Sequence, residues 1–552
     1  MKIEKKDFIF LPLGGSSEIG MNSNLYHYQD NWIMVDLGIS FADETMPGVD
    51  ILLPDIDFIV QRRDKLKGIF LTHGHEDHMG AIQYIWDKLR VPIYGSAFTI
   101  ALLKKKLKDI GLLNNVELII LNEDKEINLG PFKIKPISIT HSIPDPLSLS
   151  ITTESGTVFH TGDWKFDNNP KVGAKTNLDN LKSIGDKGVL AIVGDSTNSF
   201  VEGKTQSEND AYEGLKSVIN SSNGRIIITC FASNVARIKS IIDASIENNK
   251  KVFIAGRSLN RAIEAANEVG YRVEGIEKSF KNLENFSHNN VVIVAGGSQG
   301  ETRSTMTRIA NSQHEQIKLK PGDTAIFSSS KIPGNELAIE RVHNALLKNG
   351  IKVITDEDEL VHVSGHPGKD DIIKLYNLIK PQISIPVHGT SRHLREHCEI
   401  AENCGVSLSI QPENGSVIKL SGNSPSIIYQ IPTKSSVPDG NQIIKSDSSI
   451  FSTRRRLLWN GSISVVLAFD FDLDLHLPIK LSHNGITEGK SELEWVSEVK
   501  DDIEETVYSL SKNQLTDDKI IEDKVRTSIR SVTKLFFNIK PLIDVHLSLI
   551  HI

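Results

Sequence analysis

The stretch LTHGHEDHMGA at residues 71–81 constrains the fold of this chain more than any other part of the sequence. It follows the apolar run KGIF, so we expect a buried strand to end where three histidines and two acids begin. His73 and His75 are one residue apart on an extended turn, and Asp77 and His78 follow at the expected start of a helix. Imidazole and carboxylate groups are the ligands of Zn²⁺ or Mn²⁺ at hydrolytic centres. The stretch therefore predicts a metal site at a strand end.

A two-metal site needs further ligands from outside this loop. Two ions about 3.5–4 Å apart need more ligands than one loop can supply. Three further residues close apolar strands elsewhere: His141 follows KIKPISIT, Asp163 follows TVFHTG and His388 follows ISIPV. Side chains at one edge of a sheet converge in space even when they are distant in sequence. The alternative is a surface histidine cluster with unrelated polar strand ends, and the specific local spacing argues against it.

Length and composition are those of a soluble globular protein. At 552 residues the chain is expected to hold about three to five structural units. Hydrophobic content is 39%, and no apolar run approaches the ~20 residues needed to cross a bilayer. We see no signal peptide, and the three cysteines are too few and too irregularly spaced for a disulfide framework, so we expect a cytoplasmic protein. The formal net charge of -8 does not favour general nucleic-acid binding but allows a local basic groove.

The pattern of the sequence changes along the chain. The first two hundred residues alternate short β-branched runs, such as NWIMVDLG and GTVFHTGD, with turns. From about residue 206, helical patterns alternate with apolar runs such as RIIITC and VVIVAGG, which predicts a parallel α/β sheet. Near residue 355 strands return in VHVSGHPG and ISIPVHG. The polar stretch 433–448 is interpreted as a linker, followed by a strand-rich and then helical end.

The motifs and their order resemble a known enzyme superfamily. HGHEDH, with VDLG upstream and THSIPD and HTGDWKFD downstream, resembles the metallo-β-lactamase superfamily. The later GDSTN, FASN, SGH and PVHG are similar to the motifs of its β-CASP nucleases. With GGSQGE at 296–301 and SSSKIPGNE at 328–336, their order resembles the bacterial ribonuclease J family over nearly the whole chain, more weakly after about residue 435. The metal motif alone identifies only the superfamily, and the combination indicates a nuclease.

The resemblance implies an α/β (α+β) fold built on a four-layer αββα metallo-β-lactamase core. A β-CASP α/β domain is inserted in this core, and a small C-terminal α+β domain would help to form dimers or tetramers. The active-site cleft is expected between the core and the inserted domain. The implied boundaries are 1–205 and 355–432 for the core, 206–354 for the β-CASP domain, 433–454 for the linker and 455–552 for the C-terminal domain.

The resemblance also implies two Zn²⁺ or Mn²⁺ ions per chain. Their implied ligands are His73, His75 and His141 for one ion, Asp77, His78 and His388 for the other, and Asp163 as a bridge. Such ions lower the pKa of a shared water to about 7 for attack on a phosphodiester, so Asp77 is counted among the catalytic residues. Asp36 of VDLG would orient ligands from behind, or would be only a carboxylate at a strand-end turn. Asp50 and Asp447 could contribute to a peripheral divalent site of the kind seen among relatives.

Cleavage of a nucleic acid also needs a group that protonates the leaving oxygen. His366 of HVSGH can donate a proton, and the resemblance implies a position beside the scissile phosphate. Asp195 of GDSTN would support the same region. Either residue could be the general acid.

A second phosphate site is implied by FASN. Ser233, Asn234 and Val235 lie between an expected strand and an expected helix, and a helix N-terminus is a natural anion site. The resemblance implies that they grip a 5′-monophosphate together with residues 362–366, namely His362, Val363, Ser364, Gly365 and His366. Cleavage would then count nucleotides from that end. By propensity alone, an ordinary Ser/Asn helix cap is the alternative.

The implied activity is hydrolysis of single-stranded RNA to 5′-phosphorylated products. It would run 5′ to 3′ from a 5′-monophosphate end with additional internal cleavage, in rRNA maturation and mRNA turnover. Other RNA-decay or ribosomal factors are further implied partners. The resemblance implies no association with a membrane. Two alternatives stay open: another hydrolase of the superfamily acting on DNA or a small ester, which would not use FASN and SGH, and a non-catalytic RNA-binding scaffold. A scaffold is expected to have lost metal ligands, whereas all seven positions are filled here.

Two other patterns are weaker. RHLREH places His393 and His397 at the spacing of a metalloprotease motif, but Leu394 stands where its Glu would be, so a solvated or capping helix is expected. The basic runs at 104–106 and 454–456 could contact RNA phosphate, although a charge run is usually a solvated face.

Two residues depart from the family pattern. Thr390 follows PVHG where an acid is expected, and Pro367 follows SGH where a small residue is more usual. Neither position is a metal ligand. The departures therefore concern how the loops beside His366 and His388 are braced.

Overall fold

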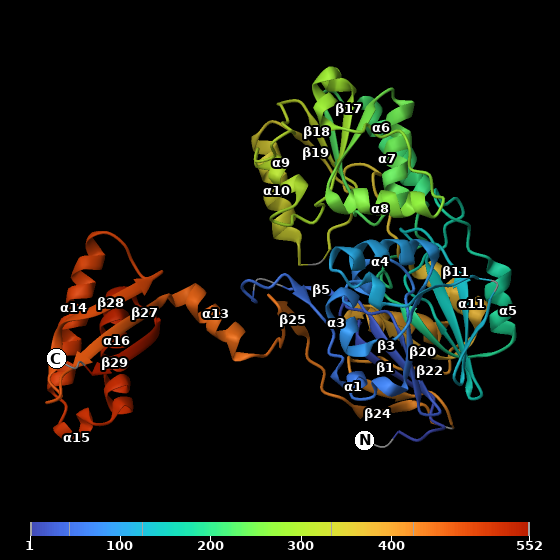
Figure 1. The fold of residues 1–552 in the computed structure, drawn as a ribbon. Helices are drawn as coiled ribbons and strands as arrows, with labels where there is room; N and C mark the ends of the chain where they lie inside the picture. Colours follow the sequence, from blue (N-terminus) through green and yellow to red (C-terminus); the bar gives the residue numbers. More distant parts are fainter. Residues whose placement is uncertain (1–2, 43–44, 124, 333, 423, 550–552) are drawn as a thin grey trace. The chain divides into compact units, whose positions relative to one another are not determined.

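The computed structural model describes residues 3–42, 45–123, 125–332, 334–422 and 424–549. The chain divides into two compact units, whose helices and strands are drawn in Figure 1. The first unit comprises Met1–Phe41 and Ile51–Pro438, and the second comprises Ala42–Asp50 and Asp439–Ile552.

Within the described residues, two large sheets form the centre of the first unit. One has eight strands in the order β24-β23-β1-β3-β4-β7-β8-β9, and the other has seven in the order β10-β11-β12-β13-β14-β20-β22. Buried apolar side chains of both sheets, such as Phe10, Phe70, Leu149 and Ile385, pack into one cluster. The strands of the first sheet are β1 (Ile9–Gly14), β3 (Ser23–Tyr28), β4 (Asn31–Val35), β7 (Leu66–Phe70), β8 (Ile93–Gly95), β9 (Leu118–Ile120), β23 (Ser416–Lys419) and β24 (Ser426–Gln430). Those of the second are β10 (Ile127–Leu129), β11 (Phe132–Ser138), β12 (Leu147–Thr153), β13 (Gly156–His160), β14 (Val189–Asp195), β20 (Pro381–Val387) and β22 (Leu408–Ser409).

Helices cover the outer faces of these sheets. Leu181, Ile372 and Ile400, from three different helices, join Phe159 and Ile192 of the second sheet in a separate apolar cluster. Helix α4 lies against β8 and β9 of the first sheet. The helices are α1 (Asp57–Val60), α2 (Glu76–Met79), α3 (Ile82–Leu89), α4 (Ala97–Asp109), α5 (Leu178–Asp186), α11 (Lys369–Ile379) and α12 (Ser391–Asn403). The predicted α/β fold with an αββα core is confirmed.

A five-stranded parallel sheet, with helices on both faces, lies in the chain between β14 and β20. We call it the insert. Its strand order is β16-β17-β15-β18-β19, and Figure 1 shows α6 and α7 on one side and α9 and α10 on the other. The strands are β15 (Ile226–Thr229), β16 (Lys251–Ala255), β17 (Val291–Ala295), β18 (Thr324–Phe327) and β19 (Lys352–Ile354). The helices are α6 (Glu208–Ser221), α7 (Val235–Glu247), α8 (Arg257–Glu268), α9 (Thr305–Ala310) and α10 (Glu336–Lys348).

Several parallel strands of the core end side by side. In the seven-stranded sheet β13 pairs with β14 and β14 pairs with β20, with Asp195 opposite Val387. In the eight-stranded sheet β4 pairs with β7, with Val35 opposite Phe70. The loops after these strands therefore start at neighbouring points, because the carboxyl ends of parallel strands lie at the same edge.

The segment VHVSGHPG does not form the strand expected from its sequence. Residues 361–367 have no regular secondary structure. Side-chain hydrogen bonds hold this segment instead: Asn198 Nδ2 donates to Ser364 Oγ (2.8 Å), and Thr205 Oγ1 donates to the His366 carbonyl (2.7 Å). The alternation of apolar and polar residues in this segment thus corresponds to buried and partly exposed positions of a loop.

The second unit contains a three-stranded sheet in the order β28-β27-β29. Ile463 and Val465 of this sheet pack against Trp495, Val499 and other buried residues of its helices. The elements are α13 (Ser449–Asn460), β27 (Ser462–Phe469), β28 (Leu475–Asn484), α14 (Lys490–Tyr508), α15 (Lys512–Leu515), α16 (Asp518–Phe537) and β29 (Leu542–Leu549). The remaining short strands of the chain are β2 (Ser16–Ser17), β5 (Ser40–Phe41), β6 (Ile51–Leu52), β21 (Gly389–Thr390), β25 (Ser436–Asp439) and β26 (Gln442–Lys445).

None of the helices in the described ranges combines the length and the apolar character needed to cross a membrane.

Candidate functional site

The seven residues predicted as metal ligands lie together at the strand ends. They come from the loop after β7, the first turn of α2, and the segments that follow β11, β13 and β20. Their ligand atoms form two groups that share one carboxylate: His73, His75, His141 and Asp163, and Asp77, His78, His388 and Asp163. A third group joins Asp163 to Asp195 and His366. The structure therefore brings every predicted ligand, and both candidates for the general acid, into one cluster.

The first group has the spacing of a metal-ligand set. His75 Nδ1 lies 2.9 Å from His73 Nε2 and 3.1 Å from His141 Nε2. Asp163 Oδ2 lies 3.7 Å from the same nitrogen of His73 and of His141. Ligand nitrogens about 2.0–2.1 Å from a tetrahedral Zn²⁺ lie about 3.3 Å from one another. The four atoms match that spacing.

The second group has similar spacing and uses the same carboxylate oxygen. His78 Nε2 lies 3.2 Å from Asp163 Oδ2 and 3.5 Å from Asp77 Oδ2. His388 Nε2 lies 3.4 Å and 3.2 Å from the same two oxygens. His388 has a left-handed backbone with φ of 54°, which a histidine adopts only when its surroundings hold it there. Its N–H donates to the Gly15 carbonyl (2.6 Å), which fixes this turn.

Among the described residues, some buried polar atoms of the cluster make no hydrogen bond, although His388 Nε2 lies within ion-pair distance of Asp77 and Asp163. Asp163 Oδ1 and His388 Nε2 are buried and make no hydrogen bond within the described part of the chain. A buried polar atom without a partner costs about 1–3 kcal/mol, so a native site normally satisfies it. Because the unsatisfied atoms are a carboxylate oxygen and an imidazole nitrogen, a divalent cation satisfies both.

The ionisation states of the cluster also suit a cation. Burial lowers the pKa of His73 and of His141 well below the usual value, so both rings are neutral, as ligands must be. Burial alone would raise the pKa of Asp163, but the surrounding imidazoles, His388 foremost, outweigh it and hold the pKa well below its usual range. Burial would lower the pKa of His388, yet Asp163 and Asp77 raise it to about 10. A cation would displace the proton on this ring.

Groups behind the ligands hold the rings in place. Asp36 Oδ2 lies 2.8 Å from His78 Nδ1, and its Oδ1 accepts from the Thr72 backbone N–H (2.8 Å). His141 Nδ1 donates to the Gly365 carbonyl (2.7 Å), which leaves its Nε2 for the cluster. A Cβ at position 365 would lie 2.7 Å from His141 Cε1, so only glycine permits this contact.

Sequence reasoning missed two of these supporting residues. Thr72 Oγ1 contacts both Asp36 (2.8 Å) and His73 Nδ1 (3.0 Å), and Asn22 Nδ2 lies 3.1 Å from His78 Nε2. The position of Thr72 inside the histidine motif was a usable signal. Asn22 lies just before β3 and carries none, because it is remote in sequence from the histidine motif.

His366 and Asp195 form a dyad beside the metal ligands. His366 Nδ1 lies 2.8 Å from Asp195 Oδ2 and 3.9 Å from Asp163 Oδ2. Asp195 Oδ1 accepts from the backbone N–H (2.9 Å) and the hydroxyl (2.7 Å) of Thr197. Burial would lower the pKa of His366, but Asp195 and Asp163 outweigh it and raise the pKa above the usual value. The ring therefore carries a proton that it can give away.

The FASN segment is placed at a helix N-terminus, as expected. Asn234 is the N-cap of α7, and its Oδ1 accepts from the Arg237 N–H (2.8 Å). The Val235 N–H donates to the Ser233 carbonyl (2.9 Å). The cap expected from propensity therefore exists, at the positive end of a thirteen-residue helix. Arg237, which sequence reasoning missed, donates from Nη1 to His362 Nδ1 (2.9 Å) and so connects this helix to residues 361–366.

The expectation for His397 was wrong. Its ring is 2% exposed and lies between Ser196 Oγ (2.8 Å) and Tyr376 OH (3.0 Å), so it belongs to the core. His393 contacts Thr390 Oγ1 (2.6 Å) instead. Thr390 thus braces the first turn of α12, where the family pattern has an acid.

The two basic runs contact protein groups. Lys105 pairs with Glu268 of the insert (2.6 Å), and the buried Lys106 pairs with Glu76. Arg454 makes two hydrogen bonds to Asp439 (3.0 and 2.7 Å). These contacts favour the structural reading of both runs.

The peripheral metal site stays a prediction. Among the described residues, the clusters that could hold a metal all include Asp163, and neither Asp50 nor Asp447 belongs to one.

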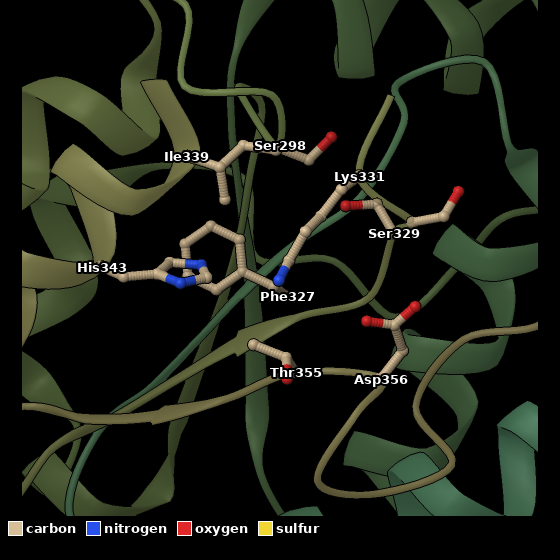
Figure 2. A pocket seen from close by; sticks show the side chains of 9 residues that line it. Ser298, Phe327, Ser329, Lys331, Ile339, His343, Thr355 and Asp356 are labelled. Atoms are coloured by element: carbon tan, nitrogen blue, oxygen red, sulfur yellow. The ribbon is translucent and has the colours of Figure 1, made fainter. Parts of the chain in front are cut away.

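A small hollow lies where β17, β18 and β19 of the insert end (Figure 2). Phe327 and His343 line it, with ring centroids 4.2 Å apart, and Lys331 and Asp356 also line it. His343 Nε2 is buried and makes no hydrogen bond to any described residue. The hollow has room for about one water, which would satisfy this nitrogen. It is too small to hold a nucleotide.

Three stretches of the chain match known families. Residues 20–197 match the metallo-beta-lactamase superfamily, and residues 223–346 match the beta-CASP domain of ribonuclease J. Residues 350–410 match the Zn-dependent metallo-hydrolase RNA specificity domain. The three matches follow one another in the order of the predicted core, insert and returning core.

Similar proteins extend over most of the chain. Ribonuclease J of Sinorhizobium meliloti is 37% identical over 99% of this chain and 98% of that protein. Ribonuclease J 1 of Streptococcus pyogenes is 35% identical over 84% of each chain, and ribonuclease J2 of Bacillus subtilis is 34% identical over 83% of each. A solved protein of unknown function from Enterococcus faecalis V583 shares the fold, with a TM-score of 0.52, 18% identity, and coverage of 75% of this chain and 99% of that one.

Proposed function

Because the chain belongs to the ribonuclease J family and is a metal-dependent enzyme that hydrolyses RNA, we propose that it degrades single-stranded RNA 5′ to 3′. It prefers a 5′-monophosphate end and also cuts internally. One observation carries the proposal: the hydrogen bond from Arg237 of α7 to His362 connects the helix N-terminus to the segment that ends at His366, beside the metal ligands. The proposed site for the terminal phosphate is thereby connected to the proposed cleavage site.

The cofactor is two divalent ions, Zn²⁺ or Mn²⁺, held by the two groups that share Asp163. When bound, they supply Lewis acidity, which lowers the pKa of a water and neutralises charge on the phosphate. Asp77, His78 and His388 hold one ion, and His73, His75 and His141 hold the other. The spacing of the ligand atoms around Asp163 Oδ2 supports this set.

His366 is the general acid. Hydrolysis to 5′-phosphorylated products releases the 3′ oxygen of the upstream nucleotide, which needs a proton. Asp195 contacts His366 Nδ1 and raises the pKa of the ring, so Nε2 is the atom that can donate to this oxygen. Asp195 itself is 1% exposed, which favours an orienting role for it.

The 5′-phosphate is held by Ser233, Asn234, Val235 and residues 362–366. The positive end of α7 attracts the phosphate, and backbone and side-chain donors of both segments contact it. We further propose roles in rRNA maturation and mRNA turnover and a dimer or tetramer as the assembly. The proposed domain boundaries are 1–205, 206–354, 355–432 and 455–552, with a linker at 433–454.

Cleavage of one labelled RNA with three different 5′ ends tests the proposal. RNA bearing a 5′-monophosphate, a 5′-triphosphate or a 5′-hydroxyl is incubated with Zn²⁺ or Mn²⁺. We expect mononucleotides released fastest from the monophosphate. Asp77→Ala should lower the rate by more than about a hundredfold, because even groups behind metal ligands are worth about 10–100-fold.

Glu76→Ala is the matched control, since Glu76 precedes Asp77 but pairs with Lys106. Its rate should stay close to wild type. Internal cuts with no 5′ preference would contradict the phosphate-binding role of FASN and residues 362–366, but they would still support the metal centre. Faster cleavage of DNA or a small ester than of any of the three RNAs would favour the other hydrolase class.

A further inference from the structure

Arg237 is a charged side chain in the interior of the protein. It is 0% exposed, in the first turn of α7. Its Nε donates to Glu208 Oε1 (2.6 Å) and its Nη2 to Glu208 Oε2 (3.0 Å), so the two charges meet through two parallel hydrogen bonds. A buried charge is tolerated only when it is paired and hydrogen-bonded in this way. Both residues of the pair belong to the insert.

The other terminal nitrogen of the guanidinium, Nη1, contacts groups other than Glu208. Nη1 lies 2.8 Å from Ser328 Oγ, 3.1 Å from the Ser328 carbonyl and 3.3 Å from the Val361 carbonyl. It also lies 2.9 Å from His362 Nδ1. One nitrogen of the insert therefore contacts the segment that leads back into the core.

The contact with His362 determines where that ring carries its hydrogen. A guanidinium has only donors and keeps its charge in proteins, so Nδ1 must offer its lone pair. The ring is then neutral, with its hydrogen on Nε2. Burial, with Arg237 and Lys165, outweighs a hydrogen bond to the Ser328 backbone and holds the pKa of His362 well below its usual value, which agrees with a neutral ring. The ring is partly exposed.

We propose that Arg237 is a positioning residue for recognition of the RNA 5′ end: it fixes His362 in the form that presents an Nε2 hydrogen to the terminal phosphate. The inference rests on the proposed function, because it needs a 5′-phosphate site at residues 362–366. In addition, the Glu208–Arg237 ion pair inside the insert determines the orientation of a phosphate-binding residue. Glu208 orients Arg237 and Arg237 orients His362, and of these three residues His362 alone contacts the phosphate.

The test compares kcat/KM for 5′-monophosphate and 5′-hydroxyl forms of one RNA. Arg237→Lys cannot bond to both Glu208 oxygens and His362 at once, because lysine lacks the planar fork. We expect the ratio to fall about ten- to a hundredfold, as for the loss of one hydrogen bond to a charged group, with most of the change in KM. Metal-dependent turnover of bis(p-nitrophenyl) phosphate, which has no 5′ end, is measured in parallel and should fall less than the ratio.

A double-mutant cycle separates positioning from general support. In His362→Gln the amide nitrogen of the side chain supplies the donor without help from Arg237. Adding Arg237→Lys should then change the ratio little, so the two substitutions are non-additive. Equal losses in both backgrounds would overturn the proposal, because Arg237 would then act through other groups. Glu208→Gln, which keeps Arg237 in place, is a second variant and should lower the ratio in the same direction.

Arg225→Lys is the matched control. Arg225 is also buried, at 5% exposed, but lies just before β15 and donates to the Lys318 carbonyl (3.2 Å). In Arg225→Lys the ratio of kcat/KM values for the two RNAs should equal that of wild type. A fall of this ratio as large as the one in Arg237→Lys would overturn the proposal. Absence of 5′ preference in wild type would reject the proposed function itself. A preference that wild type has and Arg237→Lys retains would reject only the role of Arg237.

Discussion

Asp36 contacts the metal ligands from behind. Its two oxygens bond to Thr72 and to His78, and its φ of 64° turns the chain sharply after β4. The clustering of the seven proposed ligands could be predicted, because four of them are close in sequence and the others follow strands. Of the groups behind the rings, Asp36 and Thr72 lie in recognisable motifs. The contact of Gly365 with His141 could not be predicted, because the two residues are remote in sequence. Residue types in the sequence thus indicate candidate metal ligands, whereas tertiary contacts determine how the histidine rings are oriented.

Asp36→Asn tests the orienting role. The amide keeps the shape and tolerates the left-handed backbone, but it replaces a carboxylate acceptor with a neutral group. We expect the affinity for Zn²⁺ to fall about 10–100-fold, the range for partners behind metal ligands, measured by competition with a chelator. Asp30→Asn is the control, since Asp30 also has positive φ (62°) but pairs with Lys65 at the surface. Equal affinities in both variants would reject the role.

At the scale of elements, the site depends on the ends of β14 and β20 and on α12, which packs against them. The strands could be predicted from their apolar runs. The loop 361–367 could not, since its alternation of exposed and buried residues matches that of a strand, while its hydrogen bonds go to Asn198 and Thr205. The burial of His397 was missed for a related reason: spacing on a helix does not tell which face is covered.

His397 should make folding sensitive to acid. Burial lowers its pKa to about 4, against about 6.5 in the unfolded chain. The unfolded state therefore binds more protons between pH 6.5 and 4, and stability is lost as the pH falls through this window. Between pH 7 and 5 wild type should lose about 2 kcal/mol more than His397→Asn in the free energy of unfolding by urea. His546→Asn, at an exposed position on β29, is the control, and identical pH slopes for all three proteins would contradict the assignment.

At the scale of the molecule, the chain forms two compact units, and the second has its own apolar core of a sheet and two long helices. The α/β class and the core with an insert could be predicted from motif order. The inclusion of Ala42–Asp50 in the second unit could not, because nothing in that short stretch indicates a partner four hundred residues away.

Removal of residues 455–552 tests the predicted role in assembly. We expect the full-length chain to sediment as a dimer or tetramer and the shortened chain at a lower assembly mass, because the interface is lost. Sedimentation equilibrium at matched protein concentrations measures both. An unchanged number of chains per particle would show that the interface lies elsewhere.

The pairing of β14 with β20 has a consequence for the protein while it is being synthesised. Six of the seven ligands precede the insert, but His388 follows it, and the slot between β14 and β22 is filled only by β20. At about 5–20 residues per second, a ribosome needs on the order of ten to forty seconds to synthesise the chain between these strands. During that time the growing polypeptide lacks His388, one of the seven proposed ligands. With His388 as a ligand, the metal site would be complete only after most of the chain has been synthesised.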